Sequence, residues 1–122
     1  MHDIYFEINQ HLQQKYAHFE QLLAYMGKAK EKVAEEEFEA INEIMQQCAP
    51  VMQKINHENA KIQLVLDSLD SNTKALVNAC IQQYDEPVAN PELHQMYLLA
   101  VAERDLAAEL KEATIVLNEE LS

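Results

Sequence analysis

The sequence predicts an all-α fold: an antiparallel bundle of three long helices plus one short helix, in a single domain that covers residues 1–122. Apolar residues recur at seven-residue spacing over long stretches, and the chain has one glycine, three prolines and no tryptophan. Alanine, leucine, glutamate, glutamine and lysine dominate the composition, and all of them favour helices. A β-rich fold needs many turns, and the Gly and Pro residues that turns require are scarce here.

The first helix is predicted over about residues 3–34. Its seam row is Tyr5, Leu12, Phe19, Met26 and Val33, and a second row holds Ile8, Leu22 and Ala29, with Lys15 as an interruption. Two such rows form the stripe of a helix that packs against other helices.

The second helix is predicted over about residues 36–69. Its seam row is Ile41, Cys48, Ile55, Ile62 and Leu69, and its companion row is Phe38, Met45, Met52 and Leu66. The phase of the apolar pattern shifts between Val33 and Ile41, which predicts that the chain reverses at residues 35–37. Because no Gly or Pro marks this reversal, one continuous bent helix is the alternative.

Two cap signals place the remaining helices. The cluster of residues 70–73, Asp-Ser-Asn-Thr, opens a short helix over about residues 72–84, which Asp85-Glu86-Pro87 ends. Asn90-Pro91-Glu92 then starts the last helix, predicted over residues 91–121. Its apolar stripe is wide, so we expect two contact faces, or one contact face and a spare one.

Charge and composition limit the partners. The formal net charge is −12, and nine basic residues are scattered without a basic stripe, so we expect binding neither to nucleic acid nor to anionic membrane surfaces. No apolar run approaches the length of about 20 residues that a helix needs to cross a bilayer, and the N-terminus lacks a secretory pattern.

Cys48 and Cys80 lie at apolar helical positions and are expected to be free thiols. We expect a soluble, cytoplasmic protein.

A search for chemistry favours no enzyme, no cofactor and no metal. Di-metal bundles use Glu-x-x-His, but no acidic residue stands three positions before His11, His18, His57 or His94. The cysteines form no zinc spacing, and no glycine-lined loop supports a nucleophile or a phosphate. His11 and His18 share one stripe, either as a pH-sensitive or metal-binding pair or, the favoured interpretation, as half-exposed residues at the edge of the seam.

The order of these segments carries a family resemblance. The first helix passes through Leu22-Leu23, a junction near Val33 leads into Phe38-Glu39-Ala40-Ile41, and the second helix continues through Met52-Gln53-Lys54-Ile55. This layout resembles the FlgN-like family of flagellar export chaperones, most closely over residues 32–55 and in outline over nearly the whole chain. Two features depart from that family: Glu35-Glu36-Glu37 replaces a Gly-Asp-like junction, and an asparagine-rich stretch is reduced to Asn118.

The resemblance implies a small cytosolic chaperone. Such a protein binds the helical C-terminal region of a hook-associated flagellar subunit and keeps that subunit export-competent. In the family the last helix binds the client, which implies Leu110, Ile115, Leu117 and Leu121 as partner-binding residues. The alternatives are that these residues complete the bundle or a homodimer seam, and that the protein is a structural coiled coil or homo-oligomeric bundle without an export client. An enzyme or phosphotransfer module is the third and least favoured possibility.

Overall fold

The computed structural model describes residues 2–83, 86 and 89–121 of the chain. Within these residues there are four helices and no strand, which confirms the all-α prediction. The helices are α1 (His2–Ala34), α2 (Phe38–Asp67), α3 (Ser71–Ile81) and α4 (Pro91–Leu121). The second long helix continues through Pro50 without a break.

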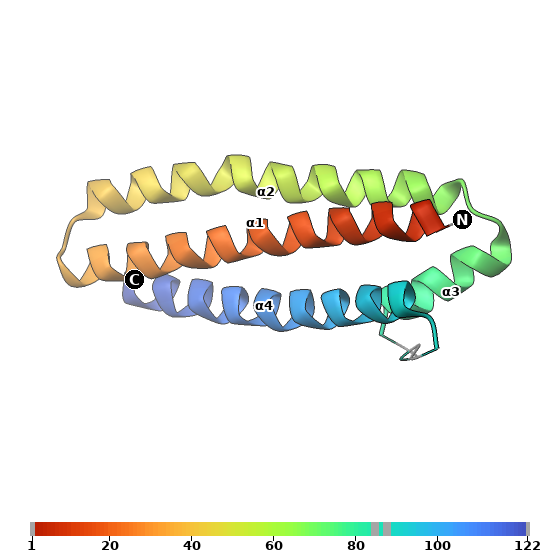
Figure 1. Cartoon of the computed structure of the whole chain (residues 1–122). Coiled ribbons are helices and arrows are strands. Elements are labelled where there is room, and N and C mark those ends of the chain that lie inside the picture. The colour runs from red at the N-terminus through yellow and green to blue at the C-terminus, as the bar shows by residue number, and fades with distance from the viewer. Residues whose placement is uncertain (1, 84–85, 87–88, 122) are drawn as a thin grey trace.

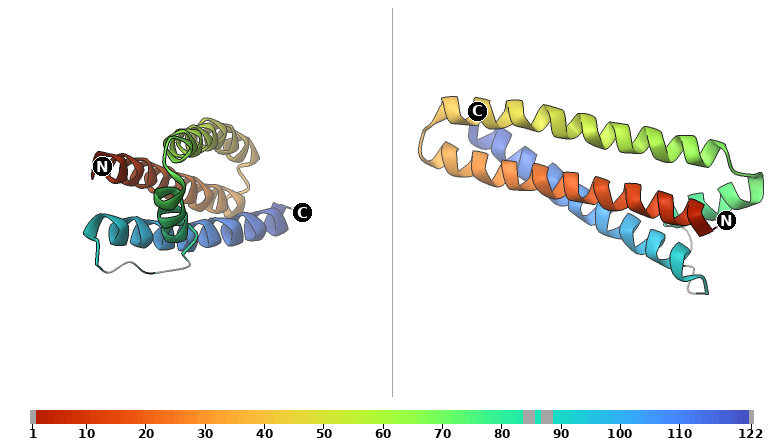
Figure 2. Two further views of the ribbon diagram at one scale, coloured as in Figure 1. Left: turned by 90° about the vertical axis from the view of Figure 1, so that its right-hand side faces the viewer. Right: turned by 45° about the horizontal axis from the view of Figure 1, so that its top comes forward.

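The long helix α1 lies between the two other long helices (Figure 1). Helix α2 runs antiparallel to α1, and α4 returns parallel to α1, so that successive long helices alternate in direction (Figure 1). Both α2 and α4 pack along α1, but among the described residues no Cα atom of α2 lies within 8 Å of one in α4. Viewed from the end, α2 and α4 lie on different sides of α1, and α3 spans from one to the other (Figure 2).

Two apolar clusters form the core. The first lies at the end of the bundle where α1 and α4 begin, which we call the α3 end because α3 packs there. It contains Ile8, Leu12, Ile62, Leu66, Val77, Cys80, Leu93 and Met96. The second lies toward the opposite end, which we call the turn end because α1 and α2 are joined there. It contains Leu22, Met26, Ala29, Cys48, Val51, Ile55 and Leu117. Only the first cluster includes residues of α3.

The predicted reversal at residues 35–37 is confirmed, because α1 ends at Ala34 and α2 begins at Phe38. Glu36 has a positive φ of 60°, a left-handed conformation that usually belongs to glycine. The amide of Glu36 donates to the Val33 carbonyl at 3.0 Å, and the amide of Glu37 donates to the Lys32 carbonyl at 2.9 Å. These two bonds form a Schellman motif that ends α1 with a non-glycine residue in the left-handed position.

Side-chain caps start the last two helices where the sequence predicts them. Asp70 accepts a hydrogen bond from the Thr73 amide at 3.3 Å. The side chain of Asn90 accepts from the amides of Glu92 and Leu93, at 3.0 and 3.1 Å. Both carboxamide and carboxylate oxygens satisfy amides that have no partner within the helix.

The short helix is shorter than predicted. It ends at Ile81, and Gln83 takes a positive φ of 64°, which stops the helical path. The predicted end at Tyr84 and the predicted stop residues Asp85 and Pro87 lie outside the described residues.

Candidate partner-binding surface

A polar layer crosses the middle of the bundle between the two clusters. His11 Nδ1 of α1 lies 2.5 Å from Glu58 Oε2 of α2, and the two side chains are 14% and 7% exposed. With its amide nitrogen turned toward α2, Gln14 donates to Glu58 Oε1 at 2.8 Å. Burial of a carboxylate requires partners of this kind, since an unpaired buried charge is strongly destabilising.

The same layer accounts for Lys15, which interrupts the second apolar row of α1. Its Nζ atom lies 2.7 Å from Glu103 Oε1 of α4, and both side chains are largely buried. At the α3 end, the Asn9 side chain donates to the Glu92 carbonyl at 3.1 Å. These contacts fix how α2 and α4 are aligned along α1, so we interpret the layer as structural.

The two histidines of the first helix have different surroundings. His11 belongs to the polar layer, whereas His18 is half-buried and has no hydrogen bond or ion pair with any described residue. Across residues 2–83, 86 and 89–121, no three side chains of His, Cys, Asp or Glu form a group that could hold a metal ion.

The two cysteines lie in different clusters, Cys48 in the second and Cys80 in the first, and both are buried. Burial raises the pKa of the Cys48 thiol above its ordinary value, which keeps that thiol protonated and unreactive.

The four residues that the family resemblance implies as partner-binding residues do not share one accessible face. Leu117 is 1% exposed and belongs to the second core cluster, against which Leu110 also packs. Ile115 and Leu121 are 48% and 43% exposed. In the free chain, Leu110 and Leu117 therefore hold α4 on the bundle, and only Ile115 and Leu121 are available to a partner.

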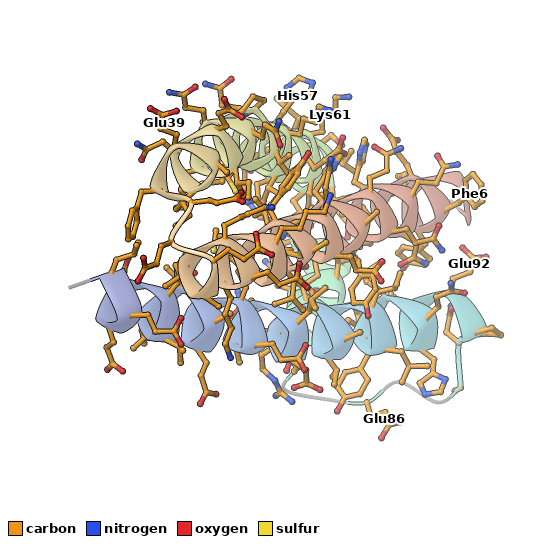
Figure 3. All side chains as sticks on the ribbon, turned by 90° about the vertical axis from the view of Figure 1, so that its left-hand side faces the viewer. Phe6, Glu39, His57, Lys61, Glu86 and Glu92 are labelled. Carbon is orange, nitrogen blue, oxygen red and sulfur yellow. The ribbon has the colours of Figure 1, made fainter. Side chains whose placement is uncertain are left out.

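A second set of accessible apolar residues lies on α2, where the sequence predicts a companion row of the seam. The prediction that Phe38, Met45 and Met52 pack inside the bundle is wrong, because they are 57%, 38% and 56% exposed. The helix instead buries Val51 and Glu58, which lie on the opposite side of the Ile41–Ile62 row. Glu39 and His57 point away from α1 and α4 (Figure 3).

The exposed residues of α2 belong to a seven-residue row, which we call the α2 inner row: Phe38, Met45, Met52, Asn59 and Leu66. Residues at this spacing share one face of a helix. Leu66 is 5% exposed and shares the first cluster with Val77 and Cys80 of α3. The uncovered members lie farther along the same face, toward the turn end.

A matching row runs along α4, and we call it the α4 inner row: Leu93, Ala100, Ala107, Thr114 and Leu121. Leu93 lies in the cluster that contains α3, and the Gln83 side chain after α3 donates to the Ala100 carbonyl at 3.2 Å. Leu93 and Ala100 are buried, Ala107 and Thr114 are half-buried, and Leu121 is exposed. Both inner rows are thus covered at the α3 end and become accessible toward the turn end.

Acidic side chains surround the outermost apolar residue of this surface. Phe38 lies in a shallow depression that is also lined by Glu36, Glu37, Glu39 and Glu43. Lys32 is within 3.1 Å of Glu35 and 3.2 Å of Glu37, and its hydrogen bonds to these two carboxylates raise the pKa of its ammonium group. In the described part of the chain, Glu36, Glu39 and Glu43 form no salt bridge.

Comparison with protein-family models, with curated proteins and with solved structures finds no match for this chain. The candidate surface is therefore defined by the geometry of the chain alone. Among the described helices, none is both long enough and apolar enough to cross a membrane.

Proposed function

We propose that this protein binds a helix of another protein and does not catalyse a reaction. One observation carries the proposal: large apolar side chains remain accessible along the two inner rows at the turn end, on a chain of net charge −12. Exposed apolar residues that share one face are typical of a protein-binding surface. An amphipathic helix is the natural ligand of a surface formed by two parallel or antiparallel helices.

Within this class, we propose a cytoplasmic flagellar export chaperone. The resemblance to FlgN-like proteins supplies the class of client, the helical C-terminal region of a hook-associated subunit. Such a subunit exposes an apolar helical face before assembly, and a chaperone that covers this face prevents early polymerisation. The acidic surface supports the proposal further, because high net charge keeps a chaperone–client complex dissolved.

The test is co-purification of the tagged chain from its native cytosol, followed by mass spectrometry of the retained proteins. The proposal expects a flagellar hook-associated subunit at a fixed ratio to the chain. Recovery of the chain alone, at a stable multiple of its own mass, would contradict the chaperone role and favour a structural homo-oligomer.

Size measurements separate these two functions without knowledge of the client. Sedimentation over a range of concentrations reports the mass of the free chain. A monomer supports a chaperone that awaits a client, whereas an oligomer that survives dilution supports a structural bundle.

A further inference from the structure

We infer that the client helix docks across both inner rows at the turn end, on the side of the bundle that α3 covers at the other end. This inference rests on the proposed function and adds α2 to the binding site. The occupant is a single amphipathic helix of about four turns, with an apolar face and basic residues beside that face.

The first support is the way in which this chain covers the same two faces with its own α3. At the α3 end, Val77 and Cys80 of α3 share one cluster with Leu66 of α2 and Leu93 of α4. A short helix of the chain therefore packs against both inner rows at the α3 end, where it meets Leu66 of α2 and Leu93 of α4. Beyond α3 the two rows continue on the same helical faces, so they present the same kind of surface to a second helix.

The second support is the size of the uncovered segment. From Phe38 to Met52 the α2 inner row rises along 14 residues, a length of about 21 Å at the rise of an α-helix. A client helix of about 14 residues has the same length. With such a helix in place, α1, α2, α4 and the client would form a four-helix bundle at this end.

Charge decides between a client helix and a second copy of the chain. Two copies each carry a net charge of −12 and repel one another. The carboxylates of Glu36 and Glu43 have no described cation as a partner, and both side chains line the depression that contains Phe38. Lysine or arginine residues at the edge of a client helix would pair with them, which favours a basic amphipathic helix as the occupant.

The residues exposed on the α2 inner row also indicate that the site can bind client helices with different apolar residues. Two of the three exposed apolar residues of the α2 inner row are methionines, whose flexible thioether side chains adapt to partners of different shape. We therefore expect recognition of the apolar spacing and the charge of the client helix, with little dependence on its exact residues.

The test uses fluorescent synthetic peptides of about 18 residues, long enough to cover the uncovered rows. One peptide carries leucines on one helical face and lysines elsewhere, a second replaces the lysines by glutamates, and a third scrambles the first. We expect the leucine–lysine peptide to bind at least about tenfold more tightly than either of the others. Equal binding of the patterned and scrambled peptides would overturn the inference, since it would indicate attraction by charge alone.

Matched variants locate the site on the full-length chain. The double variant Met45→Gln/Met52→Gln changes the exposed part of the α2 inner row, and Leu121→Gln changes the end of the α4 inner row. The control Leu64→Gln/Leu98→Gln alters apolar residues that are 72% and 51% exposed but lie off both rows. We expect each inner-row variant to weaken the leucine–lysine peptide at least about tenfold, and the control to change its binding less than about twofold. Equal losses in control and inner-row variants, or no loss in the inner-row variants, would overturn the inference.

Two further readouts distinguish this site from the proposed function. If the wild-type chain and Met45→Gln/Met52→Gln both retain a flagellar subunit from cytosol, the export role stands and the docking site is wrong. If the wild type retains no flagellar subunit but binds the peptide through Met45 and Met52, the export role is wrong and the docking site stands. A wild-type dimer that this variant converts to a monomer would show that a second copy covers the rows, which overturns the inference.

Discussion

The two ends of this bundle present the same pair of helical faces in two different states. At the α3 end, the inner rows of α2 and α4 are covered by a helix of the chain itself, and Leu66, Val77 and Leu93 are buried together. At the turn end, the same rows continue without a covering helix, and Phe38, Met52 and Leu121 are exposed.

The difference teaches that the apolar pattern of a long helix marks faces that can be covered, without saying what covers them. In the sequence, the buried Leu66 and the exposed Phe38, Met45 and Met52 of the α2 inner row are all large apolar residues. The α3 end is completed by the fold, whereas the turn end is available to a partner. Substitutions at matched positions of the two ends can test this comparison directly.

The largest expected effect comes from truncation of one inner-row residue at each end. Leu66→Ala removes a side chain that is 5% exposed, and we expect it to lower the free energy of unfolding by about 2–5 kcal/mol. Met52→Ala lies on the same row but is 56% exposed, and we expect a change within about 0.5 kcal/mol. Urea unfolding followed by circular dichroism measures both. Similar losses in the two variants would break the comparison.

The boundary between the two ends is tested at the polar layer. His11→Ala leaves the buried carboxylate of Glu58 without its closest partner, and we expect a loss of about 2–3 kcal/mol at neutral pH. His57→Ala, on the exposed side of α2, serves as the matched control and should change stability by less than about 0.5 kcal/mol.

A double variant of this layer sharpens the interpretation. His11→Leu with Glu58→Leu removes both polar groups, and we expect it to recover most of the loss, because a buried polar pair is replaced by apolar contacts. If the double variant is as unstable as His11→Ala, the layer contributes more than the pairing of these two side chains. Thermal or urea melts of the four proteins of the cycle give the coupling between the residues.

A smaller effect is expected at the turn itself. Glu36→Gly removes the strain of a left-handed non-glycine residue, and we expect it to raise stability by about 1 kcal/mol. Glu36→Ala removes the same carboxylate but keeps the Cβ atom, so it should give little or no gain. An equal gain in both variants would mean that charge repulsion among the neighbouring glutamates, and not backbone strain, limits the turn end.

The smallest expected effect concerns acid stability at the α3 end. Hydrogen bonding from Thr73 lowers the pKa of Asp70 below 3.8, and hydrogen bonds from Gln63 and Lys74 lower the pKa of Asp67 in the same way. Because these pKa values are lower in the folded chain than in the unfolded chain, their contribution is complete above about pH 4 and is lost as the pH falls further.

The variant Asp70→Ala tests this pH dependence. It lacks the cap of α3, so its melting temperature should lie slightly below that of the wild type near neutral pH, and the difference should shrink as the pH falls below about 4. A difference that stays constant down to the lowest pH would contradict the role of the Asp70 carboxylate.

Much of the fold follows from local patterns in the sequence. The heptad rows of α1, the cap residues Asp70 and Asn90, and the phase shift before Ile41 predicted the helices and the reversal between α1 and α2. The end of the short helix was placed too late, because Gln83 adopts a left-handed conformation that only its backbone geometry reveals.

The candidate surface was predicted only in part. Ile115 and Leu121 are accessible as expected, but Leu117 completes the second core cluster and Phe38, Met45 and Met52 are exposed. In α2, the rows on either side of Ile41 and Cys48 are both rich in apolar residues, so periodicity did not distinguish the buried row from the exposed one. One signal was available: Glu58 on the buried row and His11 on α1 are polar residues that can pair with one another across the two helices.

By itself, the sequence determined that this chain forms helices, where they begin, and that each carries an apolar stripe, because these properties depend on residues within a few positions of one another. Only the tertiary structure decided which side of each stripe is buried. That choice depends on the rotation and alignment of α2 and α4 along α1. The contacts of Glu58 with His11 and of Lys15 with Glu103 fix this alignment. Among the described residues α2 and α4 both pack on α1 without contacting one another, and α3 packs against both of them at one end while leaving their inner rows exposed at the other.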